Sequence, residues 1–344
     1  MLTAVQDAVN QYLPAKRKHN STSGWVSFNA VCCHHNGESQ DTRGRGGIIT
    51  NGNGSVSYSC FNCGFTANYT PGRHLSYKFR KLLRWMGADD NTIKRLVIEA
   101  IRVKDFIAPE ELKAEQQEVS FAPRTLPEDS VSFSQWRTFL SLQNEDEPIH
   151  PQFVKAFNYI HERKIDFNKY EFYTTESTAY NLHRRVIVPF YWKGELIGYT
   201  ARGVEENVKP KYHSQYAHDY IFNVDTQTNE KKFVIVVEGP FDAMAIDGVA
   251  VLGNEISEVQ ADVIDSLGRE VIVVPDNDRA GHSLVSQAIE YGWSVSFPIW
   301  HEDCKDVGEA VIKYGKLFVL KAILDAKEST KLKIELKKKK MNND

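Results

Sequence analysis

The sequence predicts a mixed α/β protein, α+β overall, with a small N-terminal β domain, a linker and a larger α/β core built on a parallel sheet. Three observations predict this. Four of the five cysteines are crowded between Cys32 and Cys63. An acidic, proline-bearing stretch covers residues 105–130. Two continuous β-branched runs, at 233–237 and 270–274, have the composition of buried parallel strands.

Composition places the chain among ordinary globular proteins. Its 344 residues are 42% hydrophobic and 25% charged, which is enough for two domains with their own cores. No apolar run approaches the roughly 18 residues of a membrane span, so we expect a soluble, cytoplasmic protein without a membrane partner. The cysteines cluster with two histidines, which indicates metal ligands in a reducing compartment and not a disulfide framework.

The net charge of −3 is unevenly distributed. Residues 15–80 contain eight Lys or Arg and two acidic residues, whereas residues 105–130 contain seven acidic residues and two basic ones. This pattern is typical of a phosphate-binding module followed by a linker, although solvated surface charge alone would give the same counts.

The N-terminal domain is predicted from a turn signal. The turn Asn51–Gly54 separates two short β-branched segments and predicts a β-hairpin between the cysteine pairs. Residues 77–101 carry apolar side chains at helical spacing, interrupted at Gly87, and predict a two-piece helical bridge.

The core is predicted from a change to strand patterns after His183. The expected strands are 185–191, 195–202, 233–237 and 270–274, and the expected helical segments are 242–246 and 284–291. The lysine-rich end, 337–340, is predicted to be a disordered basic tail.

Two knuckles, Cys32-Cys33-His34-His35 and Cys60-Phe61-Asn62-Cys63, predict a zinc ribbon. Zn²⁺ needs four ligands in a tetrahedron, and two short-spaced pairs on opposite turns supply them. We choose Cys32, His35, Cys60 and Cys63 because Cys33 or His34 would make an adjacent or cramped pair. With all four positions filled by protein, the metal would be structural. Unrelated core cysteines are the alternative interpretation.

The ribbon surface combines aromatic and basic residues. Arg43, Arg45 and Phe61 are candidates for stacking and phosphate contacts with single-stranded DNA. Other aromatics of the ribbon, such as Tyr58 and Phe65, are equally consistent with its small core.

Carboxylates follow both β-branched runs. Glu238 comes directly after the first run, and Asp276 and Asp278 follow the second. The carboxyl ends of parallel strands meet at one edge of a sheet, so we expect these three side chains to converge. Such a cluster is stable mainly with cations among the carboxylates, and oxygen ligands suit Mg²⁺ or Mn²⁺. The expected chemistry is phosphoryl transfer.

Two motifs, Glu238-Gly and Asp276-x-Asp278-x-x-Gly281, together resemble the TOPRIM domain that bacterial-type primases share with type IA topoisomerases. The cysteine ribbon resembles the N-terminal zinc domain of DnaG-like primases. Segments 185–190, 198–202 and 209–212 resemble the basic strand region that precedes TOPRIM in those enzymes, and the order of all the pieces matches.

The resemblance implies roles for individual residues. Glu238, Asp276 and Asp278 would be catalytic and would bind Mg²⁺, with Asp306 completing the site. The family commonly has a second aspartate two positions after the last carboxylate, where this chain has Gly308. The residues implied to line a groove for template or incoming triphosphate are Arg185, Arg202, Lys209 and Lys211.

The implied function is that of a DNA primase, which makes short RNA primers from NTPs on a single-stranded DNA template. No Gly-x-x-x-x-Gly-Lys-Ser/Thr loop occurs, so we expect a separate hexameric replicative helicase as a partner. The short segment after Tyr314 favours a bacteriophage enzyme. A non-catalytic recombination mediator with a zinc finger and a TOPRIM domain is the alternative, and a topoisomerase would need a large gate domain as well.

Five regions follow. They are a zinc-ribbon template-recognition domain (1–75), a helical bridge with the acidic linker (76–145), the basic N-terminal part of the primase core (146–230), a TOPRIM metal-binding catalytic domain (231–315) and a C-terminal helix with the basic tail (316–344).

Overall fold

The computed structural model describes residues 3–20, 23–73, 75–104, 119–142, 149–228, 230–276, 281–299 and 304–341. The chain divides into two compact units. The first comprises Met1–Glu118 and Ala261–Gly268, and the second Val119–Gln260 and Arg269–Asp344. The division after Glu118 falls within the acidic stretch where the sequence predicts a linker. Residues 105–118 of that linker lie outside the described residues.

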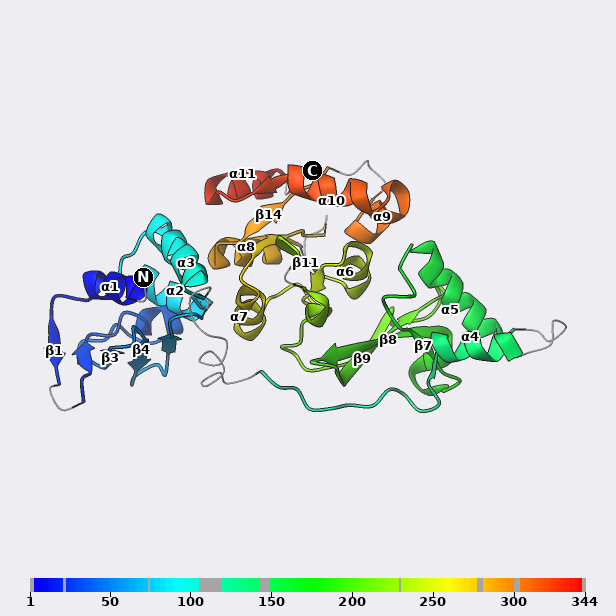
Figure 1. The fold of residues 1–344 in the computed structure, drawn as a ribbon, viewed down its shortest axis with the longest axis horizontal. Helices are drawn as coiled ribbons and strands as arrows, with labels where there is room; N and C mark the ends of the chain where they lie inside the picture. The colour runs from blue at the N-terminus through cyan, green and yellow to red at the C-terminus, as the bar shows by residue number, and fades with distance from the viewer. Residues whose placement is uncertain are drawn as a thin grey trace. The chain divides into compact units, whose positions relative to one another are not determined.

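The first unit contains an antiparallel sheet whose strands follow one another in chain order (Figure 1). The strands are β1 (Arg17–His19), β2 (Val26–Phe28), β3 (Gly46–Thr50), β4 (Val56–Cys60) and β5 (Thr66–Tyr69). The Asn51 amide donates to the Ser55 carbonyl at 3.0 Å, closing the turn between β3 and β4. The predicted hairpin is therefore confirmed.

Helices complete the first unit. They are α1 (Ala4–Tyr12), the 3₁₀ turn η1 (Cys33–Asn36), α2 (Tyr77–Trp85) and α3 (Asp90–Lys104). The Ser76 side chain accepts the Phe79 amide and so begins α2. Gly87, with φ of 103°, separates α2 from α3, as the sequence predicts. Leu82 and Leu83 are fully buried in the core of the ribbon, so the bridge belongs to the first unit.

The second unit begins with an antiparallel sheet in the order β10-β9-β8-β7-β6. Its strands are β6 (Val131–Ser132), β7 (Tyr173–Thr174), β8 (Arg185–Trp192), β9 (Glu195–Gly203) and β10 (Tyr212–Gln215). The helical elements of this part are α4 (Phe133–Leu142), α5 (Pro151–Glu162) and the short 3₁₀ segments η3 (Ala179–Arg184) and η4 (Val224–Thr226). The β8–β9 hairpin confirms the two strands expected on either side of Lys193-Gly194.

A second sheet in this unit has the order β12-β11-β13-β14-β15. Its strands are β11 (Phe233–Val237), β12 (Val249–Ala250), β13 (Glu270–Val273), β14 (Ser294–Ser296) and β15 (Lys327–Glu328). All pairs are parallel except β14 with β15. The associated helices are α6 (Pro240–Ile246), α8 (Gly281–Tyr291), α9 (Val307–Tyr314), α10 (Lys316–Asp325) and α11 (Lys331–Met341). Helix α7 (Glu258–Ser266) begins in this unit, and its residues from Ala261 onward belong to the first unit. The predicted parallel sheet is confirmed, with an antiparallel strand at one edge.

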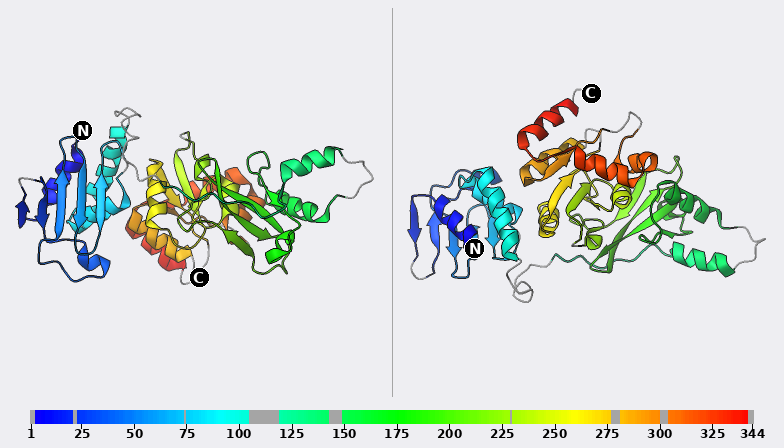
Figure 2. Two further views of the ribbon diagram at one scale, coloured as in Figure 1. Left: turned by 90° about the horizontal axis from the view of Figure 1, so that it is seen from below. Right: turned by 45° about the horizontal axis from the view of Figure 1, so that its top comes forward.

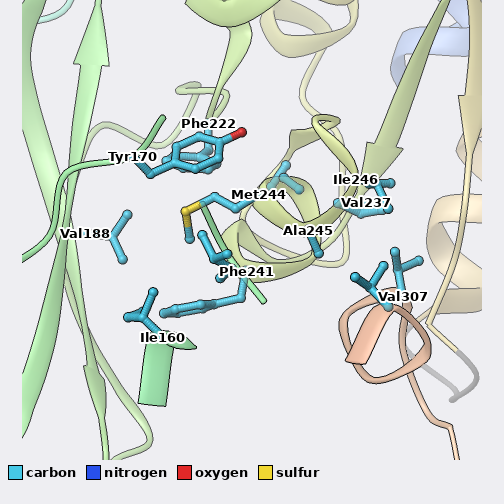
Figure 3. Close-up of a cluster of buried hydrophobic side chains, with 14 of the residues drawn as sticks. Ile160, Tyr170, Val188, Phe222, Val237, Phe241, Met244, Ala245, Ile246 and Val307 are labelled. Atoms are coloured by element: carbon cyan, nitrogen blue, oxygen red, sulfur yellow. The ribbon is translucent and has the colours of Figure 1, made fainter. Parts of the chain in front are cut away.

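One hydrophobic core joins the two sheets of the second unit (Figure 3). Phe241 and Met244 project from α6 toward Ile160 of α5 and Val188 of β8. Val307 of α9 packs near Ala245, on another side of α6. These side chains are all buried. The predicted regions 146–230 and 231–315 therefore share one core.

The lysine-rich end is helical, so the prediction of a disordered tail is wrong for residues 337–340. Within α11, Ile334 is 1% exposed and Lys337 forms an ion pair with Glu328 at 2.9 Å. Helix α11 lies beside α8 in both views of Figure 2. One buried apolar side chain and an ion pair anchor a segment whose composition alone favours disorder.

In the part of the chain that the structure describes, every helix is too short or too polar to cross a membrane.

Candidate functional site

Four cysteine sulfurs meet in the first unit. The Sγ atoms of Cys32, Cys33, Cys60 and Cys63 all lie within 4.8 Å of one another. The Cys32–Cys63 pair is 3.3 Å apart and the Cys33–Cys60 pair 3.5 Å. A tetrahedral site with Zn–S bonds of about 2.3 Å places sulfurs about 3.8 Å apart. The cluster therefore fits a four-coordinate metal ion.

The structure differs from the sequence prediction at one ligand, because it brings Cys33 and not His35 to this cluster. The exposed His35 ring stacks on Trp85 of α2, with centroids 4.7 Å apart and an interplanar angle of 5°. Cys32 precedes the η1 turn and Cys33 is its first residue. Both thiols are buried there, whereas the spacing of ligands in the sequence favoured Cys32 with His35.

A carboxylate organises the loop beside the cysteine cluster. Asp41 accepts the amides of Ala30 at 2.8 Å, Arg43 at 2.9 Å and Arg45 at 2.7 Å. The Arg45 Nε also donates to Asp41, at 2.9 Å, and its guanidinium binds the Asn62 side chain. Burial opposes ionisation of Asp41, but these donors hold its pKa well below the usual range.

The three predicted DNA contacts of the ribbon have different surroundings. Arg43 is exposed, and Phe61 is 83% exposed on the second cysteine knuckle. Arg45 is partly buried and its side chain binds Asp41 and Asn62. It therefore holds the second cysteine knuckle in position.

The carboxylates of the second unit lie at the expected edge of the parallel sheet. Glu238 follows the last residue of β11, and Asp276 lies three residues beyond the end of β13. Asp306 begins α9, where its side chain accepts the Glu309 amide at 2.7 Å. Asp278 lies outside the described residues.

Asp242, in the first turn of α6, is a further member of this group. Burial raises its pKa to about 8, and the negative charges of Asp306 and Asp276 add to the effect. The Gly308 amide donates to Asp242 Oδ1 at 2.8 Å, and this hydrogen bond lowers the pKa of Asp242. We refer to Asp242, Asp276 and Asp306 as the carboxylate cluster. Such mutual repulsion favours a cation among these groups, and their oxygen ligands fit Mg²⁺ or Mn²⁺.

Gly308 is explained by the carboxylate beside it. A Cβ at this position would lie 2.9 Å from Asp242 Oδ1 and 3.4 Å from Asp306 Oδ1. The residue that departs from the family pattern therefore makes room for Asp242 and donates a hydrogen bond to it. The sequence had one signal for Asp242, its place at the start of the helical segment predicted over 242–246, four residues after Glu238.

Basic and aromatic side chains face the carboxylate cluster. Arg202 lies over the Tyr212 ring at 4.6 Å, and Arg163 lies over the Tyr159 ring at 4.5 Å. Burial lowers the pKa of Lys211, as do the charges of Arg202 and Arg163, whereas Asp306 and Asp242 oppose the shift. The role of Arg202 and Lys211 as groove residues stays a prediction. Arg163 was missed because it directly follows α5, outside any motif.

Arg185 is not a groove residue, and this prediction is wrong. Its side chain is fully buried, and its guanidinium donates to backbone carbonyls of Tyr180, Ala201, Pro210 and Lys211. Burial lowers its pKa. The residue joins three chain segments, which a count of basic side chains cannot show.

Lys209 is exposed in the segment between β9 and β10.

Comparison with known proteins relates part of this chain to other sequences. Residues 235–311 match a Toprim-like family model. The Toprim-like segment holds Glu238 and the whole carboxylate cluster.

Two relatives are DNA primases. The chain is 26% identical over 152 residues to that of Aquifex aeolicus, strain VF5, covering 39% of this chain and 30% of the relative. It is 33% identical over 113 residues to that of Campylobacter jejuni subsp. jejuni serotype O:2, covering 28% and 19%. The chain thus spans less than a third of the length of the curated relatives it matches.

A solved structure containing the zinc-binding and RNA polymerase domains of the Aquifex aeolicus primase is also similar. It covers 95% of this chain and 85% of its own, at 16% identity and a TM-score of 0.43.

Proposed function

We propose that this protein is a DNA primase, which joins NTPs into short RNA primers on a single-stranded DNA template. The observation that carries the proposal is the carboxylate cluster in a Toprim-like segment, with Arg163, Arg202 and Lys211 facing it. Negative groups that favour a cation, next to positive groups that attract phosphate, suit a triphosphate substrate. The two DNA primases among the relatives support the assignment.

The proposed reaction gives each group of residues its own role. Mg²⁺ or Mn²⁺ would be held by Glu238, Asp242, Asp276 and Asp306. Asp278 is proposed as a further ligand on the basis of the sequence alone. The divalent ion supplies charge stabilisation on the triphosphate. Arg202 and Lys211 bind phosphate oxygens. Glu238 is the proposed proton acceptor for the attacking hydroxyl.

The first unit would bind one structural Zn²⁺ through Cys32, Cys33, Cys60 and Cys63, with Cys33 in the place first given to His35. Phe61 and Arg43 are the proposed DNA contacts there, because both are exposed and an aromatic with a nearby cation suits single strands.

A separate hexameric helicase as partner, a cytoplasmic location and a bacteriophage source stay predictions from the sequence.

The test is template-directed incorporation of labelled NTPs on single-stranded DNA of random sequence, with the products sequenced. We expect Mg²⁺-dependent primers from the native chain and none from Asp276→Asn, with template binding retained. Glu162→Gln, an exposed carboxylate of α5, is the matched control and should make primers normally. Binding of the template without any incorporation would refute the primase and favour the non-catalytic recombination mediator.

A further inference from the structure

Two stacked rings form an exposed aromatic surface in the second unit. The rings of Tyr180 and His213 have centroids 4.3 Å apart and an interplanar angle of 15°. Tyr180 is 68% exposed, and His213 is partly exposed. Because one side of the Tyr180 ring already contacts the imidazole, the exposed remainder presents an aromatic face to solvent. We call these two rings the Tyr180–His213 stack.

The strand register separates this stack from the carboxylate site. In the β9–β10 pair, Tyr212 lies opposite Arg202 and His213 opposite Ala201. Successive side chains of a strand point to opposite faces of the sheet. Tyr212 shares the face of Arg202, which borders the carboxylate cluster, so His213 and its partner ring lie on the other face.

The Tyr180 ring is held in place by an unusual backbone. Tyr180 and Asn181 have φ of 51° and 56°, in the left-handed region that costs free energy for residues with side chains. Buried Arg185 donates its Nε to the Tyr180 carbonyl at 3.2 Å and its terminal nitrogen to the Pro210 carbonyl at 2.8 Å. One guanidinium therefore fixes both the segment that carries Tyr180 and the segment that leads into His213.

A positive side chain lies beside β9, the strand that pairs with the strand of His213. The Arg124 amide donates to the Leu196 carbonyl of β9 at 2.9 Å. The Tyr199 ring is 6.4 Å from that of His213. Burial raises the pKa of Tyr199, the Tyr180 phenol adds to this, and the charge of exposed Arg124 opposes it. The charge of Arg124 therefore acts on Tyr199, the ring that neighbours His213. A rigid exposed ring beside a cation is the combination with which proteins bind single-stranded nucleic acids, the ring stacking on a base and the cation contacting phosphate.

We propose that the Tyr180–His213 stack binds a nucleobase of single-stranded DNA, with Arg124 contacting the adjoining phosphate. The proposal rests on the proposed function for the identity of the ligand. It places a DNA contact on the face of the antiparallel sheet opposite the carboxylate cluster.

The experiment measures binding of the full chain to a fluorescein-labelled 12-nucleotide single-stranded oligodeoxynucleotide, without NTPs. Tyr180→Asn removes the ring while asparagine tolerates the left-handed backbone. Because one base stacked on an aromatic side chain contributes substantially to affinity, we expect Kd to rise about tenfold. Tyr180→Phe keeps the ring and should bind within about twofold of the native chain. Phe139→Asn, the same type of change at a 48% exposed ring of α4, is the matched control.

A second readout reports stacking directly. The base analogue 2-aminopurine loses fluorescence when it stacks on a ring. In a set of oligonucleotides that carry it at successive positions, at least one should be quenched by the native chain and by Tyr180→Phe. Tyr180→Asn should not quench that oligonucleotide. Thermal unfolding of each variant checks that the fold is retained.

Three results would overturn the proposal. Equal binding by the native chain and Tyr180→Asn refutes the stack alone and leaves the proposed function standing. Weak binding by both Tyr180→Phe and Tyr180→Asn shows that the hydroxyl, and not stacking, carries the contact. A native chain that binds no single-stranded oligonucleotide refutes the stack and the proposed template together.

Discussion

Replacing Asp242 by asparagine should stabilise the metal-free protein. Asparagine keeps an oxygen for the Gly308 amide, which Asp242 accepts at 2.8 Å, and it cannot take the negative charge that Asp306 and Asp276 disfavour. The pKa of Asp242 rises from its ordinary 3.8 to about 8 in the folded chain. The carboxyl is therefore mostly protonated at pH 7 in the folded protein and ionised in the unfolded protein, which costs folding free energy.

The magnitude follows from those two pKa values. Each pH unit between 3.8 and the pH of measurement is worth about 1.4 kcal/mol, which gives an upper limit of about 4 kcal/mol at pH 7. Since Asp242 is only partly buried, water screens the charge and we expect about 2 kcal/mol. This corresponds to a rise of roughly 4–8 °C in the Tm of the second unit.

The sign of the pH dependence is specific. Below pH 3.8 the carboxyl is protonated in both states and the variant gains nothing. Between pH 3.8 and about 8 only the unfolded chain ionises, so the advantage of Asp242→Asn grows with pH and then levels off.

The assay is urea unfolding in the presence of a chelator at several pH values, with Glu162→Gln as the control that should show no such trend. Adding Asp306→Asn should shrink the effect of Asp242→Asn, because the repelling charge is gone. Asparagine can still begin α9, so the helix itself is not impaired. An advantage that does not grow with pH, or a less stable Asp242→Asn at every pH, would refute the reasoning.

Three further predictions concern single residues. Elemental analysis should find zinc in the native chain and in His35→Ala but not in Cys33→Ser. The reverse result would restore the ligand set expected from spacing. Arg185→Met should lower stability by about 2–4 kcal/mol in thermal or urea unfolding, because it leaves buried carbonyls without their donor, whereas an unchanged Tm would show that those carbonyls find water. Asp41→Asn should weaken the first unit at neutral pH. In the native chain the contribution of Asp41 is present above pH 3.8 and is lost as the pH falls through its depressed pKa, so the two proteins should converge in acid; a constant difference would contradict this.

The sequence predicted the strands well where both faces of a strand are buried. β11 and β13 consist largely of β-branched residues because both faces of a parallel sheet are covered. Their carboxyl ends then locate Glu238 and Asp276 at one edge of the sheet without further information. The turn at Asn51–Gly54 is equally local, since it depends on the backbone preferences of the four residues in it.

Only the tertiary structure decided what individual side chains do. Arg185 and Arg202 occupy similar positions in basic strand segments, yet one is buried and donates to four backbone carbonyls, whereas the other faces the carboxylate cluster. Cys33 and His35 were both available to the metal, and the direction of the η1 turn selects the thiol. Asp242 becomes a member of its cluster because α9, more than sixty residues away in sequence, brings Asp306 to it. Sequence patterns record the solvent exposure and backbone preference of short segments, whereas charge coupling and ligand geometry depend on distances between segments that only the packed chain sets.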